Sequence, residues 1–152
     1  MIDPVSFFFR DFALLRTSQF DLHERYPMQV QRYMLLWVLV RARSTSFGKK
    51  YHFEKINSIE RFQKNVPISH YEDLKPYINQ MMLGKKNILW PGNVKFFTKS
   101  SATTGESKFI PVSRSALFSC HFKGGKDMIM FYLRNNPKTH LFSGKVLSLC
   151  GT

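Results

Sequence analysis

The chain has no long apolar segment, and this absence argues against a membrane-spanning helix. Its longest uninterrupted apolar run covers residues 34–40, whereas a transmembrane helix needs roughly 20 such residues. The N-terminus also lacks the basic start and the small-residue cleavage site that mark a secretory signal peptide. We therefore expect a cytoplasmic location and no membrane partner.

Cysteine is scarce as well, and the pattern around it excludes the usual zinc sites. The two cysteines, Cys120 and Cys150, belong to no Cys-x-x-Cys pair and lie near no regularly spaced histidines. We expect no metal ion held by protein ligands and two buried free thiols. The five histidines are His23, His52, His70, His121 and His140. None has a paired acid or nucleophile motif, so ordinary core or surface roles are expected and no catalytic residue is assigned.

Acidic residues are few compared with basic ones. The chain has 10 Asp and Glu against 23 Lys and Arg, which gives a formal net charge of +13. Such a balance favours a polyanion as partner: a nucleic acid, a nucleotide or an acidic membrane surface. The basic residues form short scattered clusters, however, and no RNA-recognition signature or zinc finger accompanies them. No nucleic-acid partner is expected, although a basic nucleic-acid-binding module remains an alternative.

Helical patterns dominate the first two thirds of the chain. We expect a helix that begins at Tyr26–Pro27 and runs to about Arg43, apolar on every face in its centre and therefore buried. Gly48 would end this segment in a left-handed conformation. Two capping boxes, Asn57 with Glu60 and Ser69 with Glu72, predict two further helices. The second would reach about Leu83, with Gly84 as its stop.

The strand patterns come later. Short strands are expected at residues 88–90, 94–97, 109–112 and 146–150. A long helix, capped by Ser113 and weakened by Gly124–Gly125, would precede the last of them. Long helices followed by strand, loop, strand, helix and strand predict an α/β fold. The last strand is so apolar that it needs neighbours on both sides, which suggests the N-terminal portion of a larger enzyme.

The segment with the richest chemistry is the loop at residues 98–108, between two expected strands. It holds a cluster of hydroxyls, a glycine and a lysine: Ser100, Ser101, Thr103, Thr104, Gly105 and Lys108. Hydroxyls, backbone N–H groups and a mobile ammonium suit the phosphate tail of a nucleotide. The loop lacks the second glycine and the adjoining lysine of a Walker A sequence. Taken alone, the pattern fits a solvated turn equally well.

The loop and its surroundings resemble a known family. Residues 100–108 look like the phosphate-binding motif of the adenylate-forming superfamily, which includes acyl-CoA synthetases and firefly luciferase. Residues 45–51, 66–77 and 108–112 resemble the auxin-responsive promoter family of acyl acid amido synthetases, and residues 141–145 fit its bacterial members. The likeness runs from about Phe20 onward. It implies that residues 1–152 are the incomplete N-terminal portion of the large domain of an adenylate-forming enzyme.

This resemblance implies a two-step ligase that uses ATP and Mg²⁺. A carboxylic acid would be adenylated, and the acyl group would then pass to an amine, most simply that of an amino acid. Small carboxylic acids and amino acids are the partners implied. By the same resemblance, Ser100, Ser101, Thr103 and Thr104 would bind phosphate oxygens, Gly105 would permit the close turn and Lys108 would approach the pyrophosphate. Residues 1–152 alone are expected to be inactive.

Two features leave alternatives open. The motif does not separate amine from thiol acceptors, so a thioester ligase like the acyl-CoA synthetases is an alternative.

Ala102 stands where the family has a glycine. If that position needs a positive φ, alanine costs about 1 kcal/mol or more.

Overall fold

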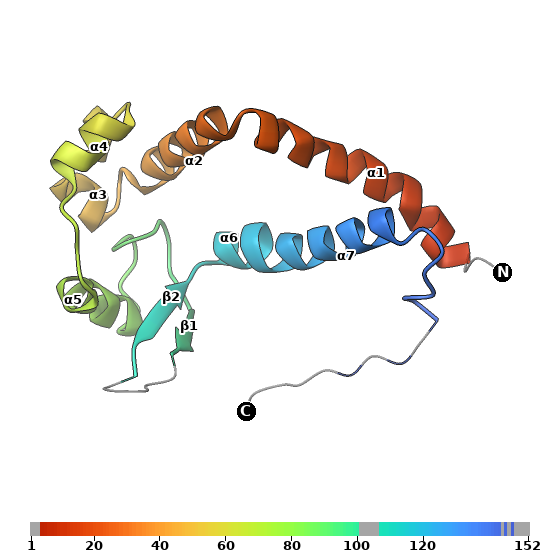
Figure 1. Cartoon of the computed structure of the whole chain (residues 1–152). Coiled ribbons are helices and arrows are strands. Elements are labelled where there is room, and N and C mark those ends of the chain that lie inside the picture. The colour runs from red at the N-terminus through yellow and green to blue at the C-terminus, as the bar shows by residue number, and fades with distance from the viewer. Residues whose placement is uncertain (1–3, 101–106, 144, 146, 148–152) are drawn as a thin grey trace. The chain divides into compact units, whose positions relative to one another are not determined.

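The computed structural model describes residues 4–100, 107–143, 145 and 147. The chain forms two compact units (Figure 1), which we call the terminal unit, residues 1–26 and 119–152, and the central unit, residues 27–118. The described residues are mostly helical, with one two-stranded antiparallel sheet. The α/β expectation therefore holds in its coarse form. None of the described helices combines the length and apolar character that crossing a bilayer requires.

The terminal unit is a pair of packed helices, α1 (Pro4–Arg25) and α7 (Lys123–Asn135). Their shared core contains Ala13, Met130 and Leu133, all nearly inaccessible to solvent. Beside this core the Arg16 guanidinium donates to both carboxylate oxygens of Asp127, each at 2.8 Å. Such a bidentate interaction fixes the relative orientation of the two side chains and is stronger than a hydrogen bond between neutral groups. The sequence did not predict α1 as a separate helix.

The central unit begins with α2 (Pro27–Ala42), which confirms the expected helix and its proline start. Leu39 and Ala42 of α2 are buried against Phe53 and Ile56, and the half-buried Trp37 lies against the Trp90 ring, with 6.0 Å between the ring centres. Val40 on another face is 60% exposed. The expectation of burial on every face is therefore wrong for this structure, because Met34, Val38 and Val40 keep substantial exposure between the packed side chains.

Gly48 lies inside α3 (Ser46–Lys50) and does not take the left-handed conformation predicted for it. It is buried against the preceding turn, where a Cβ atom would lie 2.1 Å from the carbonyl oxygen of Ala42. The buried Thr45 hydroxyl donates to that same carbonyl at 2.7 Å and accepts from the Gly48 N–H at 3.0 Å. Glycine is needed here for close backbone approach, not for a positive φ.

Both predicted N-caps are displaced by one residue, and only the second helix start has a capping box. After the short 3₁₀ helix η1 (Phe53–Lys55), α4 (Ile59–Asn65) is capped by Ser58, whose hydroxyl accepts from the Arg61 N–H at 3.3 Å. In α5 (Tyr71–Met82) the His70 N–H donates to the Asp73 carboxylate at 2.8 Å. The helix stop at Gly84 is confirmed, with φ at 81°.

Residues 88–90 form an irregular segment instead of the predicted strand. The carbonyls of Asn87 and Ile88 accept from the N–H groups of Ser46 (2.8 Å) and Phe47 (3.1 Å). These two N–H groups belong to the first turn of α3, where a helix has no internal acceptors to offer them. The segment therefore serves as a backbone cap for α3, and Ile88 fills a core with Met81 and Val94.

The sheet pairs β1 (Phe96–Lys99) with β2 (Phe109–Val112) in antiparallel register. Pro111 faces Phe97, and Lys99 faces Phe109. Hydrogen-bonded and non-bonded pairs alternate in such a ladder. The backbone bond from Ser100 N–H to Lys108 O makes that pair a bonded one, so Pro111 falls at a non-bonded position where its missing N–H is harmless.

The last helical stretch comprises α6 (Arg114–Ala116), the π-helical segment η2 (Leu117–Phe122) and α7. The predicted cap is confirmed, because the Ser113 hydroxyl accepts from the Ala116 N–H at 3.0 Å. The irregularity lies in η2, ahead of Gly124–Gly125, which sit within regular α7. The helix ends before Pro137 as expected. The strand predicted at residues 146–150 falls largely outside the described residues.

Candidate functional site

The hairpin of β1 and β2 brings together the two ends of the predicted phosphate loop (Figure 1). The Ser100 N–H donates to the Lys108 carbonyl at 2.9 Å, and the Lys108 N–H donates to the Ser100 hydroxyl oxygen at 3.2 Å. The hydroxyl accepts through a lone pair and keeps its own hydrogen to donate. Ser100 and Lys108 thus close the base of the loop.

Four of the six predicted site residues, Ser101, Thr103, Thr104 and Gly105, lie outside the described residues. Ala102 does as well. Their roles in phosphate binding stay a prediction. The structure describes Ser100 and Lys108, one at each end of the loop.

The Lys108 side chain lies against α5. Its ammonium is 5.3 Å from the centre of the Tyr71 ring. The Tyr71 hydroxyl accepts from the Phe109 N–H at 3.0 Å and donates to the Phe109 carbonyl at 3.4 Å. One tyrosine therefore contacts both the backbone at the loop exit and the cation that ends the motif. Nothing in the spacing of the sequence signalled this contact.

A cavity of about 170 Å³ lies beside this contact, between one side of α5, from Tyr71 to Met82, and residues 107–109 at the start of β2. Polar groups line it, among them Ser107, Lys108, Asn79 and Lys75. The Lys75 ammonium also pairs with the Glu72 carboxylate at 3.4 Å. The side chains of Lys75 and Lys108 thus both lie beside the point where the loop rejoins β2.

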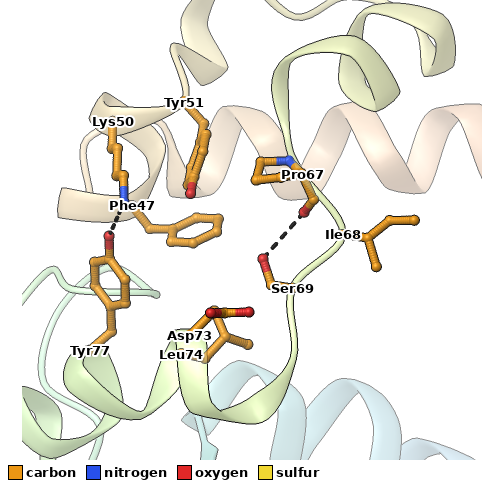
Figure 2. A pocket seen from close by; sticks show the side chains of 9 residues that line it. All are labelled: Phe47, Lys50, Tyr51, Pro67, Ile68, Ser69, Asp73, Leu74 and Tyr77. Carbon is orange, nitrogen blue, oxygen red and sulfur yellow. Dashed lines mark hydrogen bonds between the residues drawn. The ribbon is translucent and has the colours of Figure 1, made fainter.

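A larger cavity, about 340 Å³, lies elsewhere in the central unit (Figure 2). Phe47, Lys50 and Tyr51 from the α3 region face residues 67–69 and Tyr77 across it. These walls come from residues 45–51 and 66–77, two segments on which the family resemblance rests. The structure brings them together.

The Lys50 ammonium links the two walls of this larger cavity. It donates to the Tyr77 hydroxyl at 3.1 Å and lies 5.2 Å and 5.7 Å from the ring centres of Tyr51 and Tyr77. The hydrogen bond to Tyr77, followed by that to Tyr51, raises the pKa of Lys50 above its usual value. Through these contacts Lys50 ties α3 to α5.

The structure also places the cysteines and histidines considered above. Cys120 is exposed, so the expectation of a buried thiol is wrong there, and Cys150 lies outside the described residues. His70 occupies the N-cap of α5, and His121 is exposed on η2. Within the described part of the chain, no group of three or more His, Cys, Asp or Glu side chains is arranged to hold a metal ion.

Comparison with known proteins identifies the family. A model of the GH3 family N-terminal domain matches residues 16–152. The chain belongs to the GH3 family. This confirms the resemblance to acyl acid amido synthetases that the loop and its flanking segments indicated.

Several GH3 relatives come from Arabidopsis thaliana. Indole-3-acetic acid-amido synthetase GH3.5 is 26% identical over 129 residues, which cover 73% of this chain and 21% of that protein. 4-Substituted benzoates-glutamate ligase GH3.12 is 24% identical over 148 residues, covering 79% of this chain and 26% of the relative. Indole-3-acetic acid-amido synthetase GH3.2 is 30% identical over 89 residues, 57% of this chain and 16% of the relative. The chain spans about a quarter or less of these proteins.

Proposed function

We propose that this chain is part of an ATP-dependent ligase that adenylates a carboxylic acid and joins the acyl group to an amino acid. Membership of the GH3 family supports the ligase class, because the relatives' names describe amido synthetases and an acid–glutamate ligase. The observation that carries the proposal is the hairpin that closes the loop between Ser100 and Lys108. The closed base holds the Ser100 hydroxyl and the Lys108 backbone next to each other at the two ends of the loop, where we place the phosphates.

The reaction would proceed in two displacements. A carboxylate oxygen of the acid attacks the α-phosphorus of ATP, and pyrophosphate leaves. The amine nitrogen then attacks the acyl carbon, AMP leaves, and the nitrogen loses a proton. Phosphoryl transfer depends on positioning and charge stabilisation more than on covalent help from the protein. The loop would supply hydroxyl and N–H donors, and Lys108 would supply positive charge on the pyrophosphate side.

Mg²⁺ fits this scheme as a partner of the nucleotide. The described residues gather no cluster of acidic side chains for it. Mg²⁺ in nucleotide sites is commonly held by phosphate oxygens and water with one or two carboxylates. Its contribution would be to share the negative charge of the phosphates while Lys108 and the loop donors orient them.

The test is acid-dependent exchange of labelled pyrophosphate into ATP by the complete protein, screened across carboxylic acids. Aromatic acids belong in the panel because the relatives' names include indole-3-acetic acid and 4-substituted benzoates. We expect exchange with at least one acid, followed by amide formation when amino acids are added. Product formation with a thiol and not with an amine would replace amide ligation by thioester ligation. Absence of exchange across the whole panel would contradict adenylation.

A further inference from the structure

On the edge of β2 that faces away from β1, the backbone groups of Phe109 bond to a side chain of α5. Ser100 and Lys108 form a bonded pair of the ladder, so the next pair, Lys99 and Phe109, is a non-bonded one. The N–H and C=O of Phe109 therefore point away from β1. An exposed strand edge of this kind leaves backbone groups without partners in the sheet. The Tyr71 hydroxyl meets both of them, at 3.0 Å and 3.4 Å.

Tyr71 is held firmly enough to act as an anchor. It is the first residue of α5, directly after the His70 N-cap whose N–H is bonded to Asp73. Its side chain is partly buried. A hydroxyl on the first turn of a capped helix has little freedom to follow a moving strand, so contact with it restrains the loop exit.

The ring of Tyr71 restrains the lysine as well. Lys108 is a flexible four-carbon chain with a point charge at its end, and its ammonium lies 5.3 Å from the ring centre. A cation over an aromatic face is attracted by the ring quadrupole. The ammonium is therefore held near the loop exit in few conformations.

We propose that Tyr71 is a positioning residue for the phosphate loop. Its hydroxyl fixes the backbone where the loop rejoins β2, and its ring orients the Lys108 ammonium toward the bound nucleotide. This inference rests on the proposed function, because it concerns the same loop. Tyr71 acts through Phe109 and Lys108 and touches no reacting atom.

A double-mutant cycle on the complete protein tests the proposal. The measurement is the Kd of Mg-ATP at equilibrium for wild type, Tyr71→Leu, Lys108→Ala and the combined variant. Loss of the ring contact should weaken binding roughly two- to thirtyfold in the wild-type background. In the Lys108→Ala background, Tyr71→Leu should raise the Kd of Mg-ATP by a clearly smaller factor. Equal costs in the two backgrounds would assign Tyr71 a purely structural role and overturn the inference.

Hydroxyl removal gives an independent readout that does not need nucleotide. Tyr71→Phe keeps the ring and should speed hydrogen exchange of the Phe109 amide roughly fivefold, since the amide N–H loses the hydrogen bond to the Tyr71 hydroxyl. Tyr77→Phe is the matched control. It removes a hydroxyl group from the same helix, but this hydroxyl bonds to Lys50 and not to the hairpin. Equal exchange in wild type and Tyr71→Phe would contradict the anchor.

The outcomes separate the two proposals. If wild type fails to bind Mg-ATP, the proposed function fails and the positioning role with it. If wild type binds Mg-ATP and the cycle is additive, the function stands and the role of Tyr71 is wrong.

Discussion

At the scale of single residues, Gly48 shows how a glycine can be required without a positive φ. The carbonyl oxygen of Ala42 occupies the space where a Cβ would lie. From the sequence we predicted that Gly48 ends a helix, because glycine is common at helix C-termini. The close approach depends on how α3 folds back onto the end of α2, which no local pattern reveals.

A single methyl group should therefore be costly at this position. Gly48→Ala forces backbone atoms apart, and we expect it to lower the free energy of unfolding by about 1–3 kcal/mol. Gly124→Ala is the matched control: it lies in regular α7 with nothing within 4 Å of the added Cβ. That change should be neutral or stabilise by about 0.5–1 kcal/mol. Chemical denaturation measures both, and equal stabilities of the two variants would contradict the close approach.

At the scale of elements, the sequence predicted the regular parts well and their boundaries less well. The proline start of α2, the Ser113 cap and the strand of β2 were predicted correctly. Both predicted N-caps were one residue out, because neighbouring polar residues offer equally good caps and only the backbone conformation decides between them. Residues 88–90 were predicted as a strand because a short apolar run alone does not distinguish a strand from a buried irregular segment.

The displaced cap of α4 gives a direct test. The Ser58 hydroxyl accepts from the Arg61 N–H, and a hydrogen bond from Ser58 is the main cause that lowers the pKa of Glu60. Ser58→Ala should therefore lower the free energy of unfolding by about 1 kcal/mol. Asn57→Ala, at the position the sequence favoured, should change it by less than about 0.5 kcal/mol. The reverse order of the two effects in thermal unfolding would show that Asn57 is the cap.

At the scale of the whole molecule, the place of the loop between two strands could be predicted from the sequence, whereas the phosphate-binding roles of its residues stay predictions. The alternation of apolar and polar segments predicted a strand on each side of the loop, and the motif spacing predicted that Ser100 and Lys108 belong to one loop; the pairing of the two strands comes from the structure. The contacts of Tyr71 and the pairing of Lys50 with Tyr77 could not be predicted. They join residues 38 and 27 positions apart, so they depend on how helices pack and not on a local pattern.

Pyrophosphate exchange by the complete protein is the measurement that tests the central claim most directly. Lys108→Ala and Thr103→Ala should each reduce the exchange rate, on the order of tenfold to a hundredfold, if the loop at residues 98–108 holds the phosphates of ATP. Lys95→Ala, an exposed lysine just ahead of β1, should leave the rate unchanged and controls for lost charge. Undiminished exchange in both loop variants would contradict the account.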